Sequence, residues 1–279
     1  MRRVLLLLTI CLALVTGCGA TPTAAPMQPA PTAVATPSSA SGTLTVFAAA
    51  SLTEAFTELG TLFETGHPGV KVVFNFAGSQ ALSAQLGEGA PADVFASANA
   101  KEMTNAITAG RVPDGSQKTF AHNKLVVIYP ADNPAGLAKL QDLAKPGLKL
   151  VLAAAEVPVG KYSVEFLDKA TQDAAFGTTF KEDVLKNVVS YEDNVKSVLT
   201  KVVLGEADAG IVYLTDVSLD NASKVGRLDI PNALNAVATY PIATVSNATQ
   251  PELAQAFVDL LLSAQGQEIL AKYGFLPAD

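Results

Sequence analysis

Tryptophan is absent from the 279-residue chain, which has only two cysteines and two histidines. Both cysteines lie within the first 18 residues, so the rest of the chain cannot form a zinc site of the Cys/His type. Aromatic residues make up 6% of the chain, too few for a base-stacking surface. The formal charge of −7 is opposite in sign to the charge that nucleic acid attracts, so we expect no nucleic-acid partner.

Motifs for covalent catalysis are also missing. The chain has no Gly-x-Ser-x-Gly elbow and no serine followed three residues later by lysine. Residues 155–161 resemble the end of a phosphate-binding loop, but Ala155 and Tyr162 stand where that loop needs glycine and serine or threonine. His67 lies in a Gly-His-Pro-Gly turn, and His122 precedes an expected strand. The sequence therefore favours a binding protein over an enzyme.

The N-terminus has the pattern of an export signal. Arg2 and Arg3 precede an apolar run at residues 4–15, which is shorter than a membrane span of about 20 residues and typical of a signal peptide. Residues 14–18 read Leu-Val-Thr-Gly-Cys and resemble the lipobox of bacterial lipoproteins. The resemblance implies removal of residues 1–17 and lipidation of Cys18. The alternative is an ordinary secretory signal with a chance cysteine.

A tether follows the predicted cleavage site and occupies residues 18–42. Residues 19–42 contain no charged residue and five prolines, and the others are mostly Ala, Thr and Ser. Such a composition cannot bury a core, so we expect a disordered linker. Loss of the two N-terminal arginines takes the formal charge from −7 to −9, and residues 43–279 carry all of it.

Strand and helix patterns alternate after the tether. An apolar run at residues 43–50 is followed by apolar residues spaced i, i+3, i+4 and i+7 over 52–63, and an alternating run covers 70–76. Gly78-Ser79 opens a second helix. Further strands are expected at Leu125–Tyr129 and Leu150–Ala155, and further helices at Leu137–Lys145, Tyr162–Ala175 and 195–203. This alternation predicts an α/β fold with mostly parallel sheets.

Two segments of the chain look alike. Residues 89–95 read Gly-Ala-Pro-Ala-Asp-Val-Phe, and residues 205–213 read Gly-Glu-Ala-Asp-Ala-Gly-Ile-Val-Tyr. Each offers Ala-Asp after a predicted helix and leads into an apolar strand. The repeat is consistent with two similar α/β lobes that face a cleft.

Small neutral donors at helix starts are the strongest candidates for a ligand site. A helix N-terminus presents unpaired N–H groups and the positive end of a dipole, so it can hold an anion without a charged side chain. Ser51 and Ser79 each lie between an expected strand and an expected helix. For Ser51 an alternative stays open, because Ser-Leu-Thr-Glu at 51–54 fits a capping box that would engage its hydroxyl locally.

Three further positions stand at the ends of predicted elements. Val159 precedes Gly160 at the start of a helix, Val195 begins the 195–203 stripe, and Tyr213 ends an apolar strand. Each is also compatible with a plain core role.

Seven stretches give the chain a family resemblance, and they span nearly all of residues 43–279. They are 47–52 (FAAASL), 78–79 (GS), 89–98 (GAPADVFASA), 157–162 (VPVGKY), 192–195 (EDNV), 205–216 (GEADAGIVYLTD) and 266–275 (GQEILAKYGF). The chain resembles the molybdate-binding proteins of bacterial ABC transporters, which have the type II periplasmic-binding-protein fold with ligand in the interlobe cleft. The resemblance implies lobe I at 43–121 and 239–279 and lobe II at 122–238.

The same resemblance implies a ligand set, carried over motif by motif. Ser51 and Ser79 would bind the oxyanion through hydroxyl and amide, Val159 and Val195 through backbone amides, and Tyr213 through its hydroxyl. One departure is the valine at 159, where many relatives have alanine. No side chain is implied as a ligand of a metal cation, because the metal is bound as its oxyanion.

The function implied is that of an extracytoplasmic lipoprotein, anchored to the cell membrane, that captures molybdate or tungstate and delivers it to an ABC permease and its ATPase. Neither catalysis nor a cofactor is implied, and a monomer is expected. Three alternatives stay open: a receptor for another oxyanion such as sulfate, a surface protein that binds an anion without a transporter, and a hydrolase with Ser51 or Ser79 as nucleophile.

Overall fold

The computed structural model describes residues 41–217 and 221–278. The predicted signal peptide, Cys18 and nearly all of the predicted tether lie outside the described residues. Within them, no helix combines the length and the apolar character needed to cross a membrane.

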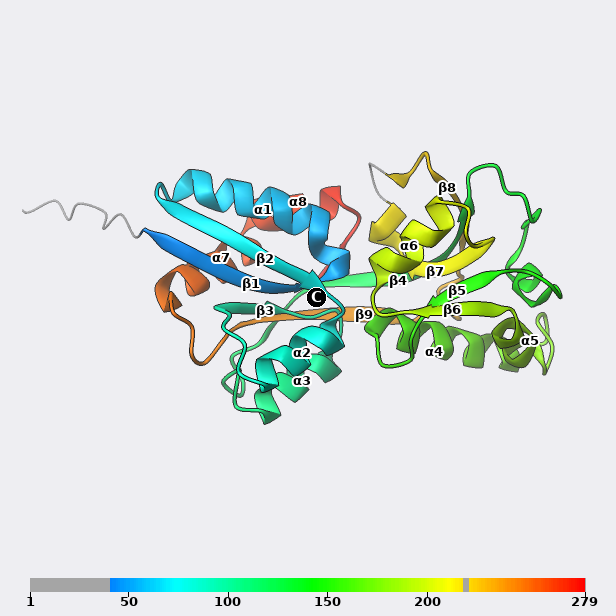
Figure 1. Ribbon diagram of the computed structural model, residues 1–279, viewed down its shortest axis with the longest axis horizontal. Coiled ribbons are helices and arrows are strands. Elements are labelled where there is room, and N and C mark those ends of the chain that lie inside the picture. The colour runs from blue at the N-terminus through cyan, green and yellow to red at the C-terminus, as the bar shows by residue number, and fades with distance from the viewer. Residues whose placement is uncertain (1–40, 218–220, 279) are drawn as a thin grey trace, which may run out of the picture. The chain divides into compact units, whose positions relative to one another are not determined.

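Ten strands and eight α-helices are found in the described part of the chain (Figure 1). The strands are β1 (Gly42–Ala49), β2 (Val70–Ala77), β3 (Val94–Ala96), β4 (Lys118–Pro130), β5 (Leu150–Ala153), β6 (Val188–Glu192), β7 (Ala209–Tyr213), β8 (Val225–Asp229), β9 (Val237–Thr244) and β10 (Leu276–Pro277). The α-helices are α1 (Thr53–Gly66), α2 (Ser79–Gly87), α3 (Ala100–Thr108), α4 (Pro158–Gln172), α5 (Phe180–Lys186), α6 (Val195–Val203), α7 (Pro251–Leu262) and α8 (Ala264–Lys272). Short 3-10 helices lie at η1 (Ala50–Leu52), η2 (Leu140–Ala144) and η3 (Leu214–Val217).

The predicted helix at Leu137–Lys145 is wrong, because only the short η2 forms there. The carboxylate of Asp142 accepts hydrogen bonds from the amides of Ala138 and Lys139 at 2.8 and 3.1 Å. These bonds hold the residues before η2 in a turn instead of a helix, and Pro146 follows closely.

The sheet path runs β2-β1-β3-β9-β4-β7-β5-β6, and β8 and β10 also pair with β4. β1 is parallel to β2 and β3, and β5 is parallel to β6 and β7. All pairings of β4 and β9 are antiparallel. The expectation of mostly parallel sheets therefore holds for the two outer parts and is wrong for the centre.

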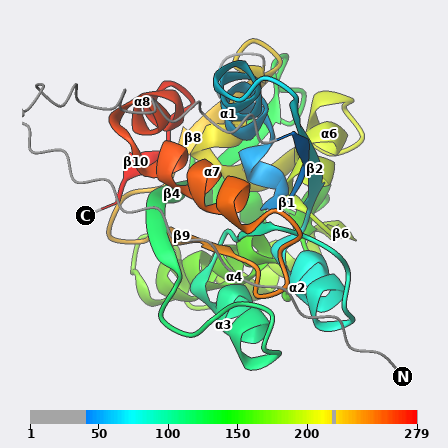
Figure 2. The same ribbon diagram turned by 90° about the vertical axis from the view of Figure 1, so that its left-hand side faces the viewer.

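β4 connects the two parts of the sheet. Its residues 118–124 pair with β9, whereas residues 125–130 pair with β7 and β8. α1, α7 and α8 pack together, and α2 packs against α3 on the other side of β1 (Figure 2). α4 and α6 pack against β5 and β7.

The repeated Ala-Asp segments perform the same structural task in the two parts. Asp93, directly before β3, binds Thr45 of the neighbouring parallel strand β1, since its carboxylate accepts from the Thr45 amide and its own amide donates to the Thr45 carbonyl, both at 2.8 Å. Asp208 makes the equivalent pair of 2.8 Å bonds with Lys149. The strand orders β2-β1-β3 and β6-β5-β7 correspond as well, so the carboxyl ends of both sets of parallel strands face one crevice.

Candidate anion-binding site

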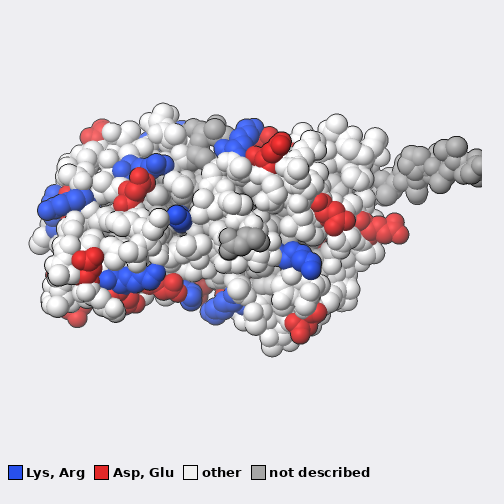
Figure 3. Space-filling model, turned by 180° about the vertical axis from the view of Figure 1, so that it is seen from behind, with Lys and Arg blue, Asp and Glu red and all other residues white. Residues whose placement is uncertain are grey.

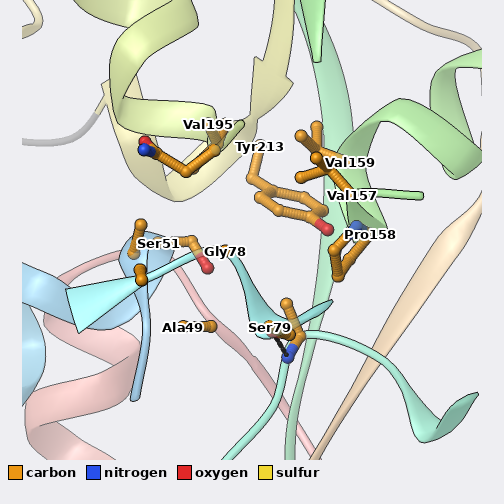
Figure 4. A pocket seen from close by; sticks show the side chains of 13 residues that line it. Ala49, Ser51, Gly78, Ser79, Val157, Pro158, Val159, Val195 and Tyr213 are labelled. Carbon is orange, nitrogen blue, oxygen red and sulfur yellow. Dashed lines mark hydrogen bonds between the residues drawn. The ribbon is translucent and has the colours of Figure 1, made fainter. Parts of the chain in front are cut away.

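A cavity lies where the strands β1, β2 and β7 end, with about 200 Å³ of space not filled by protein atoms, which includes space open to solvent. All five residues predicted from the sequence line it, and Figure 4 shows Ser51 and Ser79 on one side and Val159, Val195 and Tyr213 on the other. The full lining is Ala49, Ala50, Ser51, Ala77, Gly78, Ser79, Ala98, Val157, Pro158, Val159, Asn194, Val195 and Tyr213. No side chain in this set carries a formal charge.

Four helical segments begin at the cavity wall. Ser51 lies in η1, which leads directly into α1, and Ser79 is the first residue of α2. Val159 is the second residue of α4, after Pro158, and Val195 is the first residue of α6. The first amides of a helix have no partner within it, so this arrangement surrounds the cavity with N–H donors and positive dipole ends.

The Ser79 hydroxyl is oriented by a backbone amide. Its side chain is buried, and Oγ accepts a hydrogen bond from the Ala98 amide at 2.9 Å. An amide can only donate, so the hydroxyl proton of Ser79 stays available for an acceptor.

The capping-box alternative for Ser51 is wrong. α1 begins at Thr53 without a side-chain cap. Ser51 Oγ instead forms a 2.9 Å hydrogen bond with the hydroxyl of Tyr240, and Glu54 is engaged in an ion pair with Lys196. The Ser51 side chain is therefore free of the local role that the motif suggested.

Tyr213 provides a buried hydroxyl without a hydrogen-bond partner. The residue is 1% exposed, and its oxygen makes no hydrogen bond to the described part of the chain. Burial raises the pKa of Tyr213 well above its ordinary value, and the neighbouring Tyr240 hydroxyl adds to that shift without reaching hydrogen-bond geometry. The group is thus a neutral donor that faces the cavity.

The two valines can offer only their backbone amides as hydrogen-bond donors to the cavity. Their side chains are buried. Asn194 caps α6 by accepting from the Ser197 amide rather than from that of Val195. At Gly160 an added Cβ would lie 2.0 Å from the Ala154 carbonyl oxygen, so glycine lets α4 start close against the end of β5.

Acidic side chains near Val195 point away from the cavity and are absent from its lining. Glu192 binds Lys201 at 2.6 Å. Burial acts to raise the pKa of Glu192, but its bonds to Lys201 and Ser190 outweigh burial and lower it. The exposed Asp193 side chain accepts a hydrogen bond from Asn194. Neither carboxylate opposes an anion in the cavity directly.

Sequence reasoning missed the contacts that join the β1 and β5 parts beside the cavity. Lys196 binds the carboxylate of Glu54 at 2.7 and 2.8 Å and that of Asp216 at 3.1 Å. Gln80 donates to the backbone carbonyl of Asp193 at 2.8 Å. Burial disfavours the charge of Lys196, but the two carboxylates outweigh it and raise its pKa. Only the position of Lys196 directly after Val195 could have hinted at these contacts.

Residues 41–217 and 221–278 contain no group of three or more His, Cys, Asp or Glu side chains that could hold a metal ion. No histidine or carboxylate lines the cavity, so Ser51 and Ser79 have no base within it. The site offers hydrogen-bond donors, which suit an anion that is rich in acceptors.

Comparison with known proteins identifies the family of the chain. Residues 44–276 match the model of the bacterial extracellular solute-binding protein family. The chain is 40% identical to the molybdate-binding protein ModA of Mycobacterium bovis over 86% of both chains. It is 34% identical to ModA of Escherichia coli over 84% of this chain and 89% of the relative.

The fold matches as well. The periplasmic molybdate-binding protein of Azotobacter vinelandii superposes with a TM-score of 0.72 at 21% identity, covering 85% of this chain and all of the other. The chain therefore belongs to the bacterial extracellular solute-binding proteins and, within them, to the ModA family of molybdate-binding proteins.

Proposed function

We propose that the protein binds molybdate, and tungstate in the same way, in this cavity and delivers it to the permease of an ABC transporter. The observation that carries the proposal is a cavity lined by uncharged hydrogen-bond donors. Among them, the buried Tyr213 hydroxyl has no hydrogen-bond partner in the described structure. We assign Ser51, Ser79 and Tyr213 as hydroxyl donors and Val159 and Val195 as amide donors. The role is binding, as family membership indicates, and not catalysis.

Local donors, not net charge, must provide the affinity. The chain without its first 17 residues carries a formal charge of −9, and Lys and Arg are interspersed with Asp and Glu on the face in Figure 3. A dianion gains little from such a surface at long range. Each charge-assisted hydrogen bond in a desolvated cavity is worth about 1.5–3 kcal/mol, so five donors suffice for tight binding.

A cavity that offers only hydrogen-bond donors also discriminates between oxyanions by their protonation state. Molybdate and tungstate are fully deprotonated tetrahedral dianions near neutral pH, so each oxygen can accept. Hydrogen phosphate carries a hydroxyl that would meet another donor and find no acceptor. Sulfate has the same charge and shape but is smaller, so the dimensions of the cavity must reject it.

We further propose the division into lobe I (43–121 and 239–279) and lobe II (122–238), joined where β4 and β9 pass between them. Ser51 and Ser79 would then belong to lobe I, and Val159, Val195 and Tyr213 to lobe II. A ligand held by both lobes favours the closed state by its differential affinity. Closure is the signal that a permease can distinguish.

Lipidation of Cys18 places this receptor at the outer face of the cell membrane, and a monomer is enough because one chain provides the whole donor set. Mass spectrometry of protein extracted from membranes is expected to show Cys18 as the first residue with a lipid on its thiol. An unmodified cysteine, or a different first residue, would contradict the anchor.

Replacement of Ser79 by alanine is expected to weaken molybdate binding about tenfold or more, because one charge-assisted bond is lost. It also leaves the buried Ala98 amide unpaired, so the free energy of unfolding should fall by about 1–3 kcal/mol. Calorimetric titration and denaturant unfolding measure the two effects.

Ser83→Ala is the matched control for that variant. Ser83 is a buried serine on the same helix whose hydroxyl donates to the Glu102 carbonyl at 3.2 Å, and it does not line the cavity. Its loss should lower stability without changing affinity. Equal affinities of the Ser79 and Ser83 variants would remove Ser79 from the site.

Replacement of Tyr213 by phenylalanine is expected to separate affinity from stability. The hydroxyl has no partner in the described structure, so its removal should leave the melting temperature of the ligand-free protein unchanged or higher. Molybdate affinity should fall about tenfold or more through loss of one donor. A lower melting temperature with unchanged affinity would show that the hydroxyl is structural.

A further inference from the structure

Three buried polar side chains form a line that ends at the cavity. Asn123 on β4 donates through Nδ2 to the hydroxyl of Tyr240 on β9 at 3.3 Å. The Tyr240 hydroxyl lies 2.9 Å from Ser51 Oγ. Asn123, Tyr240 and Ser51 are 0%, 0% and 4% exposed, so water does not compete with these bonds.

The direction of the first bond follows from the surroundings of the Asn123 amide. The backbone amide of Lys124 lies 2.9 Å from Oδ1 of Asn123. A backbone N–H can only donate, so the atom that it meets must be the amide oxygen. The other end of the Asn123 amide is then the NH₂ group, which donates to Thr215 Oγ1 at 2.8 Å and to Tyr240.

The bond from Asn123 favours one direction for the Tyr240–Ser51 pair, in which either hydroxyl can donate. Because Tyr240 accepts from Asn123, its own proton is available for Ser51 Oγ. Burial raises the pKa of Tyr240 above its ordinary value, so this proton stays in place at neutral pH. When Ser51 accepts from Tyr240, its hydroxyl proton is left for the cavity, where Ser51 is part of the lining.

We propose that Asn123 and Tyr240 are positioning residues for specificity, which fix Ser51 as a donor toward the ligand and thereby exclude oxyanions that carry a proton. The inference rests on the proposed function. It adds that two residues outside the cavity lining, Asn123 and Tyr240, contribute to the selectivity for unprotonated oxyanions. Ser79 needs no such series of hydrogen-bonded side chains, because the Ala98 amide donates to its hydroxyl oxygen and leaves the hydroxyl proton for the cavity.

A purely structural role would look different. The Tyr240 ring packs edge-on against Phe120, Tyr213 and Phe275, with centroids 5.4–6.1 Å apart. If only this packing mattered, Tyr240→Phe would preserve both affinity and selectivity. The hydroxyl has a separate task only if the ratio of affinities for unprotonated and protonated oxyanions changes.

Asn123→Asp tests the proposal by reversing the direction of the hydrogen bonds that run from residue 123 through Tyr240 to Ser51. In Asn123→Asp a carboxylate accepts where the amide NH₂ donated, so Tyr240 would donate to the new carboxylate and accept from Ser51. Ser51 would then present a lone pair to the cavity. Molybdate and hydrogen phosphate both carry two negative charges, so the added carboxylate repels them alike. The ratio of their affinities therefore reports the direction of the hydrogen bonds and not the new charge.

The experiment is a titration with molybdate and a competition with inorganic phosphate, at a pH above the second pKa of phosphoric acid so that the competitor is mainly the dianion, on the wild-type protein and both variants. We expect the molybdate-to-phosphate affinity ratio to fall about tenfold or more in Asn123→Asp, as for one reversed charge-assisted bond. In Tyr240→Phe the Ser51 hydroxyl can rotate, so a smaller fall of about threefold is expected.

Asn235→Asp is the matched control, because Asn235 is a buried asparagine that pairs with the backbone of Leu125 and has no contact with Ser51. The ratio should stay at its wild-type value there. An unchanged ratio in Tyr240→Phe and in Asn123→Asp, with molybdate still bound by the wild-type protein, would overturn the inference alone. If Asn123→Asp does not fold, Tyr240→Phe decides. Absence of molybdate binding by the wild-type protein would contradict the proposed function as well.

Discussion

Replacement of Lys196 by methionine is expected to lower the free energy of unfolding by about 3 kcal/mol at neutral pH, the lower end of the cost of breaking a buried ion pair. Lys196 keeps 22% of its side chain exposed, whereas Asp216 is fully buried. Methionine fills a similar volume but leaves the Asp216 carboxylate without a cation. Denaturant unfolding of the ligand-free protein measures the loss.

The loss should depend on pH with a defined sign. Burial raises the pKa of Asp216 above its ordinary value even with Lys196 present. Without Lys196 the pKa rises further, so the folded variant binds a proton more tightly than the unfolded chain does. Stability is then lowest at neutral pH and recovers as pH falls through the folded pKa of Asp216.

A second substitution at the same site separates charge from packing. Asp216→Asn in the Lys196→Met background removes the uncompensated charge, while the amide oxygen can still accept from the Tyr213 backbone amide, as Asp216 does at 3.0 Å. Stability at neutral pH should largely return. If the double variant is no more stable than Lys196→Met, the ion pair does not explain the effect.

Replacement of Gly78 by alanine is expected to weaken molybdate binding about 5–150-fold, the equivalent of the 1–3 kcal/mol that overpacking costs. The φ of Gly78 is −60°, so alanine fits the backbone. Its Cβ, however, would lie 2.4 Å from the carbonyl oxygen of Asp193. Gly78 belongs to proposed lobe I and Asp193 to lobe II, so the methyl group prevents full closure over the ligand.

The ligand-free Gly78 variant should keep its stability, because separated lobes avoid the clash. Gly87→Ala is the control, since it lies on the adjoining helix α2, where an added Cβ would meet only the Ala109 side chain at 4.0 Å. Affinity should be unchanged there. Tight binding by the Gly78 variant would mean that the ligand is held without close approach of these two residues.

Local patterns predicted the outer parts of the fold well. The stripe at 195–203 coincides with α6, and the run at 43–50 covers β1 within one residue at each end. The Ala-Asp repeat marked two equivalent positions because each aspartate binds the backbone of a neighbouring strand. The antiparallel centre was missed, because nothing local in β4 or β9 records which strands they pair with.

At the candidate site, too, local sequence patterns predicted individual residues but not their long-range contacts. Helix starts after strands are visible in sequence, and all five residues chosen by motif line one cavity. The residues that orient them were not visible, since Asn123 is separated from Tyr240 by 117 positions and Glu54 from Lys196 by 142. Motif reasoning therefore finds residues of the cavity wall, whereas the residues that hydrogen-bond to them can be identified only from the tertiary structure.

Thermal unfolding of the purified protein with molybdate, sulfate and phosphate tests the central claim most directly. Molybdate at about 1,000 times its dissociation constant should add about 4 kcal/mol to the free energy of unfolding. For a folded part of this size that corresponds to a rise in melting temperature of about 8–16 °C. A large rise with molybdate, with little change in sulfate or phosphate at the same concentration, is the predicted result. Equal shifts with sulfate, or no shift with molybdate, would contradict the account.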